Sequence, residues 1–162
     1  MVETNIHYPT DSTLLADGVR VLTRTLRRLR TAVTDGVVRL RDRRRSVARR
    51  VFAIVPLSRR AGQEPVKARM RTLYRQLMGH TRAVVRQAER AAQHVATGTV
   101  GAVGLAPLEV EALAQQLRKT GGLVRRVLAQ TRARILAGNT HYPDKLLSLF
   151  EPHTEAIRRA KR

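Results

Sequence analysis

Apolar residues recur at steps of three and four along the first third of the chain. They are Leu15, Val19, Leu22, Leu26, Leu29, Val33, Val37 and Leu40. Side chains at this spacing share one face of a helix, so the seam predicts a helix over residues 12–50. Thr10, Asp11 or Ser12 is suited to cap its start, and Asp35-Gly36 marks a point where it can break.

Two later seams predict two more helices. Residues 64–96 keep the same stepping from Val66 to Val95 and form the second predicted helix. Pro107 suits the first position of a third helix over 107–137, which ends near Gly138. The Pro- and Gly-containing stretches between the helices, 53–65 and 97–107, are expected to be connections.

These elements predict a mainly α fold. Three long amphipathic helices with narrow seams are buried most simply in an antiparallel arrangement. Aromatic residues make up only 3% of the chain, which favours packed helices over a β-sandwich. The expected organisation is a helical region over 12–138, preceded by a short extended segment over 1–11 and followed by another over 139–162.

Charge and composition narrow the function classes. The chain has 32 Lys and Arg against 12 Asp and Glu, a formal net charge of +20, which favours a polyanionic partner. It contains no cysteine, which excludes a disulfide framework and a thiolate nucleophile. The apolar run over 51–57 is much shorter than a membrane span. The first residues lack the features of a secretory signal. We therefore expect a bacterial cytoplasmic protein associated with the nucleoid.

Arginines are concentrated between positions 20 and 50, and their guanidinium groups suit phosphate contacts. The candidate DNA-binding residues are Arg20, Arg24, Arg27, Arg28, Arg43, Arg44 and Arg45. The alternative is a solvated charged face on a basic protein. Because aromatic residues that stack on bases are nearly absent, we expect contact with the phosphate backbone and no sequence specificity.

No catalytic or metal-binding residue is predicted from the spacing of polar residues. The histidines lack metal-ligand spacing, and His80 falls in the second seam as a packed or edge residue. The Gly-rich stretch GTVGAVG (98–104) lacks the Lys-Ser/Thr of a phosphate-binding loop. The carboxylates Asp11 and Asp144 are best explained as helix caps.

One internal echo links the two ends of the helical region. The segments NIHYPTD (5–11) and NTHYPD (139–144) share Asn-x-His-Tyr-Pro followed by Asp. Two interpretations are open. The echo is a coincidence or a reused Pro-preceded helix start, or both segments connect the helices to the same neighbouring structure.

The same end segments carry a family resemblance. The strings VETNIHYPTDS (2–12) and SLFEPHTE (148–155) resemble segments of ISNCY-type insertion-sequence transposases of the DDE, RNase H-like superfamily. The match covers residues 2–22 and about 135–161, and the helices between them carry no matching motif. The resemblance implies an RNase H-like core that uses three acidic residues and Mg²⁺ to cut and join DNA, with the end segments as its stubs.

The resemblance also implies that this chain lacks the catalytic residues. In the family the first catalytic Asp lies a few residues before the VETNIHYPTDS string, whereas Val2 follows Met1 here. The other acidic residues lie beyond the string EPHTEAI (151–157), so no catalytic carboxylate maps onto a numbered position. We therefore expect an inactive transposase fragment without a cofactor of its own. Its expected partners are DNA and the intact transposase, and no membrane partner is expected.

Two other classes are open from the sequence. A free-standing basic helical protein that acts architecturally on nucleic acid has the same composition. An amphipathic protein at a membrane surface is a third hypothesis, but it calls for broader apolar faces with bulky aromatic residues.

Overall fold

The computed structural model describes residues 10–34, 36–60, 62–98, 101–138, 145–146 and 148–149. These residues form α1 (Asp11–Thr31), α2 (Arg44–Ser58), α3 (Glu64–Ala96) and α4 (Pro107–Thr131). A π-helical turn, η1 (Arg132–Leu136), continues α4. This part of the chain contains no named strand, only an isolated bridge between Val33 and Ala102, which confirms the mainly helical class.

The prediction of one helix over 12–50 is wrong, because α1 and α2 are separated by residues 32–43. The backbone of this segment bonds to a distant loop instead of continuing the helix. Thr34 N donates to Gly101 O at 3.0 Å, and Val103 N donates to Ala32 O at 2.8 Å. The break includes Asp35-Gly36, where the sequence predicted that the helix can break, and Gly36 has φ +85°, which is not a helical conformation. The described residues therefore form four α-helices, not three.

The expected connection over 53–65 is also wrong over its first half. α2 continues through Pro56 to Ser58, and only residues 59–63 separate it from α3. Pro56 lies in the last turn, where the helix loses one hydrogen bond and then ends. Ser58 Oγ donates to Val55 O at 2.6 Å and satisfies one of the terminal carbonyls.

The other two predicted helices are close to the observed ones. The helix predicted over 64–96 coincides with α3. The helix predicted over 107–137 corresponds to α4 followed by η1, which ends at Leu136. Its last turn therefore has π geometry, which the apolar spacing did not indicate.

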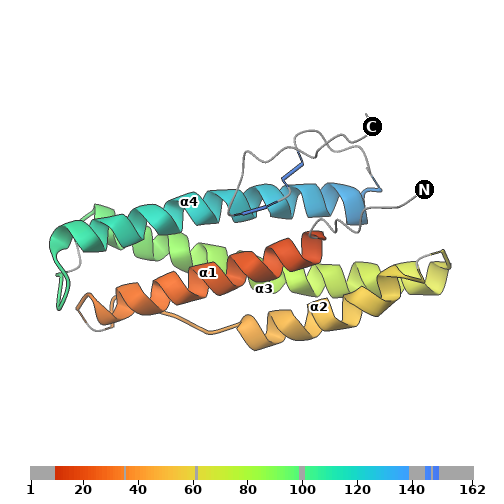
Figure 1. Ribbon diagram of the computed structural model, residues 1–162, viewed down its shortest axis with the longest axis horizontal. Helices are drawn as coiled ribbons and strands as arrows, with labels where there is room; N and C mark the ends of the chain where they lie inside the picture. The colour runs from red at the N-terminus through yellow and green to blue at the C-terminus, as the bar shows by residue number, and fades with distance from the viewer. Residues whose placement is uncertain are drawn as a thin grey trace, which may run out of the picture.

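The helices pack lengthwise around one core (Figure 1). α1 contacts the three other helices, whereas α2 does not contact α4. Figure 1 shows α2 and α4 on opposite sides of the bundle. The largest fully buried side chains come from all four helices and from Leu146. This arrangement leaves the outer face of α2 and the segment before it on the surface.

The start of α1 and the end of α4 lie side by side. Thr10, not Asp11, is the N-cap of α1, and its side chain accepts a hydrogen bond from Thr13 N. Asp11 is 1% exposed and accepts hydrogen bonds from Gln130 Nε2 at 2.9 Å and Arg134 Nη1 at 2.7 Å. The capping role predicted for Asp11 is therefore wrong, since a buried ion pair holds this carboxylate.

The same cluster holds the segment after α4. Gln130 Nε2 donates to Leu146 O at 3.1 Å, and Leu146 N donates to Gln130 Oε1 at 2.8 Å. Most of both echoed segments lies outside the described residues, as do Asp144 and most of the predicted end segments over 1–11 and 139–162. Within the described part of the chain, residues 10–11 and 145–146 flank the same end of the bundle.

Candidate nucleic-acid interface

The first group of predicted DNA-binding arginines forms an exposed stripe on α1. Arg20, Arg24, Arg27 and Arg28 lie on the side of the helix opposite its buried leucines. The helix rises about 12 Å between the first and the last of them, a span comparable to the width of the DNA major groove. The side chains are thus placed to contact phosphates along one helix face.

These four arginines differ in how their charge is compensated. Arg20 Nη2 lies 3.3 Å from Asp17 Oδ1, and both side chains are exposed. Among the described residues, no ion pair involves Arg24, Arg27 or Arg28. An exposed guanidinium without a carboxylate partner keeps its full charge for a phosphate.

Arg44 is tied to a carboxylate two residues before it. Its Nε donates to Asp42 Oδ1 at 3.0 Å and its Nη2 donates to Asp42 Oδ2 at 2.6 Å. These side-chain bonds are the main cause that lowers the pKa of Asp42 to about 2, with the backbone N–H of Arg44 contributing next. Asp42 therefore stays ionised at neutral pH and compensates the charge of Arg44.

Arg43 faces α3 instead of solvent. Its Nη1 donates to Nδ1 of His80 at 2.9 Å, and its Nε is buried without a hydrogen-bond partner in the structure. Burial lowers the pKa of Arg43, and the charges of Arg41 and Arg86 lower it further. This arginine ties the start of α2 to α3, so it has less freedom to contact DNA than Arg45, which is exposed.

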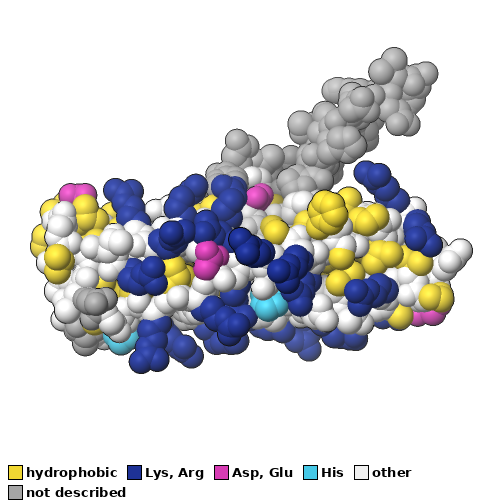
Figure 2. Space-filling model, turned by 90° about the horizontal axis from the view of Figure 1, so that it is seen from below, with side chains coloured by type: hydrophobic (Ala, Val, Ile, Leu, Met, Phe, Trp, Pro, Cys, Tyr) yellow, Lys and Arg dark blue, Asp and Glu magenta, His cyan; other side chains and the backbone are white. Residues whose placement is uncertain are grey.

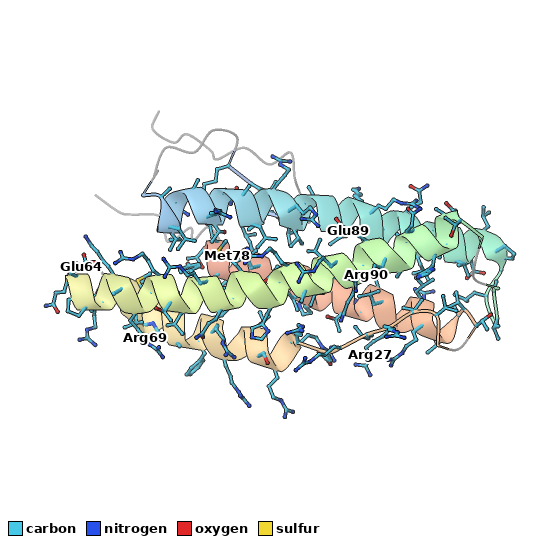
Figure 3. The ribbon with its side chains drawn as sticks, turned by 180° about the vertical axis from the view of Figure 1, so that it is seen from behind. Arg27, Glu64, Arg69, Met78, Glu89 and Arg90 are labelled. Carbon is cyan, nitrogen blue, oxygen red and sulfur yellow. The ribbon has the colours of Figure 1, made fainter. Side chains whose placement is uncertain are left out.

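The two groups join into one surface, which we call the arginine band. It comprises Arg20, Arg24, Arg27, Arg28, Arg41, Arg44, Arg45 and Arg86. The charge of Arg27 helps to lower the pKa of Asp42, so the α1 stripe adjoins the segment before α2. Figure 2 shows Lys and Arg side chains crossing this face, and Figure 3 shows Arg27 beside that segment.

Two hollows open along the segment before α2. One, of about 580 Å³, is lined by Asp42, Arg44 and Arg45. The other, of about 340 Å³, lies between this segment and α3, and its charged lining includes Arg39 and Arg90. Both are bordered by guanidinium groups, so they are suited to anionic groups such as phosphates.

The interface includes arginines that the sequence analysis did not select. Arg41 lies in the same run as Arg43–Arg45, and Arg86 belongs to α3. The repeat of Arg82, Arg86 and Arg90 at four-residue spacing was a usable signal, since this spacing places side chains on one helix face. The sequence did not show that this face adjoins the segment before α2.

Two arginines of α4 have partners in α3. Arg125 makes a two-point contact with Glu89, with Nε to Oε2 at 2.6 Å and Nη2 to Oε1 at 2.7 Å. Glu89 lies between α3 and α4 (Figure 3). Arg118 Nη2 donates to the backbone oxygen of Ala92 at 3.1 Å. These contacts join α4 to α3, and Glu89 compensates the charge of Arg125.

The described residues contain no group of three or more His, Cys, Asp or Glu side chains placed to hold a metal ion. In the same residues, no helix combines the length and apolar character needed to cross a membrane. No family model matches the chain, and no curated protein or solved structure matches it significantly.

Proposed function

We propose that this protein binds double-stranded DNA through the arginine band, by contacts with the phosphate backbone and without sequence preference. The observation that carries the proposal is that Arg24, Arg27 and Arg28, beside the basic segment before α2, are exposed and form no ion pair with any described residue. Phosphate contacts from guanidinium groups supply affinity but read no base sequence.

The aromatic side chains support backbone contact over base stacking. Tyr74 is 4% exposed, and Phe52 is the one aromatic residue among the exposed large hydrophobic side chains of the described residues. Proteins that bind single strands through bases use several exposed aromatic rings. Duplex DNA, which presents its phosphates outward, is therefore the proposed ligand.

The resemblance of the end segments supports a role in DNA transposition. We propose that the chain is a helical DNA-binding region of an ISNCY-type transposase, packed as an antiparallel bundle next to an RNase H-like core. DNA and the intact transposase are its proposed partners. On this proposal the chain itself does not cleave or join strands, because none of the family's catalytic carboxylates maps onto its numbered residues.

The salt dependence of DNA binding tests the proposed interface. Fluorescence anisotropy on two duplexes of unrelated sequence is expected to give equal affinities that fall steeply and linearly on a log–log plot against salt. Affinity that is independent of salt, or restricted to one sequence, would contradict backbone binding. Strand cleavage by the purified protein with Mg²⁺ or Mn²⁺ would contradict the proposed lack of catalysis.

A free-standing architectural DNA-binding protein is the second candidate function. The continuous core shared by the four helices favours it, since a domain with its own core can fold alone. Such a protein is expected to unfold in a single cooperative thermal transition. A broad, non-cooperative transition would favour a part of a larger transposase.

A further inference from the structure

α2 carries a row of largely apolar side chains along its outer side, and of these Val51 also packs against the core of the bundle. The row consists of Ala48, Val51, Phe52, Val55, Pro56 and Arg59. The core-facing side of the same helix is formed by Val47 and Ile54, which are 1% and 2% exposed. A helix on the surface of a bundle needs one apolar face, and within the described residues Ala48, Phe52, Val55 and Pro56 are not part of the core cluster.

Every member of this row except Val51 is exposed. Phe52 is 84% exposed and Val55 is 38% exposed. Together with Ala16 of α1, the row lines a hollow of about 490 Å³, which we call the α2 groove. In Figure 2 hydrophobic side chains gather beside the arginine band. An exposed aromatic side chain that lines an apolar hollow is a typical anchor of a protein interface.

The spacing within the row points to a helical partner. Positions 48, 51, 52, 55 and 59 correspond to i, i+3, i+4, i+7 and i+11, so the row follows the helix axis. A groove of this kind accepts the apolar face of an amphipathic helix, whose side chains recur at the same steps. The row contains one aromatic ring, whereas a helix that lies on a membrane surface carries several bulky Trp, Phe and Leu side chains on its apolar face.

The charge around the groove defines the partner further. α2 contains no acidic residue, and Arg45, Arg49 and Arg59 lie along the row. On the α1 side, Asp17 follows Ala16 in the chain but is paired with Arg20 at 3.3 Å. The rim is therefore cationic, and a second copy of this chain, with net charge +20, brings further positive charge to it. An acidic partner has complementary charge.

We propose that the α2 groove binds an acidic amphipathic helix of a partner protein. The apolar side chains of that helix contact Phe52 and Val55, and its carboxylates pair with Arg45, Arg49 and Arg59. Binding of the partner helix differs from DNA binding because burial of apolar side chains contributes to the affinity for the helix, whereas DNA binding depends on phosphate contacts. A variant that alters the apolar row without changing charge therefore distinguishes the two.

The test uses a synthetic helical peptide with leucines at i, i+3, i+4 and i+7 and glutamates on both flanks. Anisotropy of the labelled peptide is expected to show saturable binding to the whole protein. Phe52→Ser and Val55→Ser are each expected to weaken binding by about tenfold. Leu108→Ser, at an 81% exposed position at the start of α4, is the matched control and leaves binding unchanged.

Two control peptides separate shape from charge. A peptide with the same composition but with leucines spread around the helix is expected not to bind. A Glu→Gln peptide is expected to bind more weakly and with less salt dependence. Equal binding of either control, no binding of the designed peptide, or equal binding by the Phe52→Ser protein overturns the proposal.

Two further measurements test other occupants of the groove. Sedimentation equilibrium of the wild type and the Phe52→Ser variant is expected to give the same monomer mass. Flotation with phosphatidylserine vesicles is expected to be equal for both proteins. Self-association or vesicle binding that Phe52→Ser abolishes assigns the groove to a second copy or to a membrane, and overturns the proposal. Circular dichroism confirms that each variant is folded.

Discussion

Asp11 and Arg134 form an ion pair with Oδ2 and Nη1 2.7 Å apart, although 123 positions separate them in the sequence. The carboxylate is 1% exposed and the arginine side chain 28% exposed. The pair joins the first turn of α1 to η1, so it closes the end of the bundle near the segment around Leu146.

Asp11→Asn is expected to lower the free energy of unfolding by about 2–4 kcal/mol. The substitution keeps the shape but leaves Arg134 without its counter-ion at a partly buried position. Asp17→Asn is the control on the same helix, since the pair of Asp17 with Arg20 is exposed, and it is expected to cost less than about 1 kcal/mol. Urea unfolding measures both. Equal effects would show that burial of the pair contributes nothing.

Gly18→Ala is expected to destabilise the protein by about 1–3 kcal/mol, because overpacking displaces core side chains. A Cβ atom at this position of α1 would overlap Cγ2 of Val124 in α4 and meet Leu149 Cδ1 at 3.3 Å. Gly122→Ala in α4 is the control. A Cβ there has nothing within 4 Å. The substitution is therefore expected to raise the free energy of unfolding, by at most about 1 kcal/mol, because alanine has the higher helix propensity. Thermal and urea unfolding of both variants test the close approach of α1 and α4.

The apolar pattern predicted where helices occur better than where the first one ends. Leu15 to Leu29 do form the buried seam of α1. Val33 continues the same spacing and is also buried, but its backbone lies in the segment that bonds to residues 101–103. The spacing of apolar residues indicates which side chains are buried, not which backbone conformation they have. Side chains of a loop that bonds to another loop can be buried just as those of a helix are. Asp35-Gly36 indicated that the helix can break, but the extent of the break, residues 32–43, was not encoded in the local spacing.

Part of the candidate interface was also predictable from the sequence. The spacing of Arg20, Arg24, Arg27 and Arg28 predicts one helix face, and the structure places them on such a face. The different states of Arg43 and Arg44 depend on His80, 37 positions away, and on the turn that brings Asp42 against Arg44. Contacts of this kind follow from tertiary packing, which residue spacing does not encode.

The stability of the protein is expected to fall as the pH is lowered from 7.5 to 5.5, because of His80. Burial is the main cause that lowers the pKa of His80 from its ordinary value of 6.5, followed by the charges of Arg50, Arg43 and Arg41. The unfolded chain then binds more protons than the folded one, so the contribution is present above about pH 6.5 and is lost as the pH falls through the folded pKa.

His80→Gln is expected to flatten this pH dependence. The amide oxygen of glutamine is able to accept the hydrogen bond from Arg43 but does not titrate. Urea unfolding at several pH values compares the two proteins, and an NMR titration of the imidazole carbons gives the pKa of His80 directly. The same slope in both proteins would assign the pH dependence to other groups.

Asp42→Asn is expected to strengthen DNA binding about three- to fivefold. The carboxylate compensates the charge of Arg44 and also repels a nearby phosphate. Removing one negative charge a few ångströms from a phosphate makes the binding free energy more favourable by about 1 kcal/mol in water. The backbone bond from Arg44 N, 3.0 Å in the structure, is kept by the asparagine oxygen. Glu64→Gln, which frees Arg71 near the start of α3, is the control and is expected to change affinity little. An NMR titration of the Asp42 carboxyl carbon is expected to give a midpoint of about 2.

Replacement of Arg24, Arg27 and Arg28 together by glutamine is expected to lower the salt-dependence slope of DNA binding by up to about 2.7, because each lost phosphate contact contributes about 0.9. The matched triple variant changes Lys119, Arg126 and Arg132, which are exposed on α4 and η1, to glutamine. Both variants lose the same net charge, so a general effect of charge lowers both slopes equally. A specific interface requires a larger loss for the α1 variant, measured by anisotropy at four or more salt concentrations. Equal slopes for the two variants would contradict the arginine band as the DNA-binding surface, even if both bind DNA more weakly than the wild type.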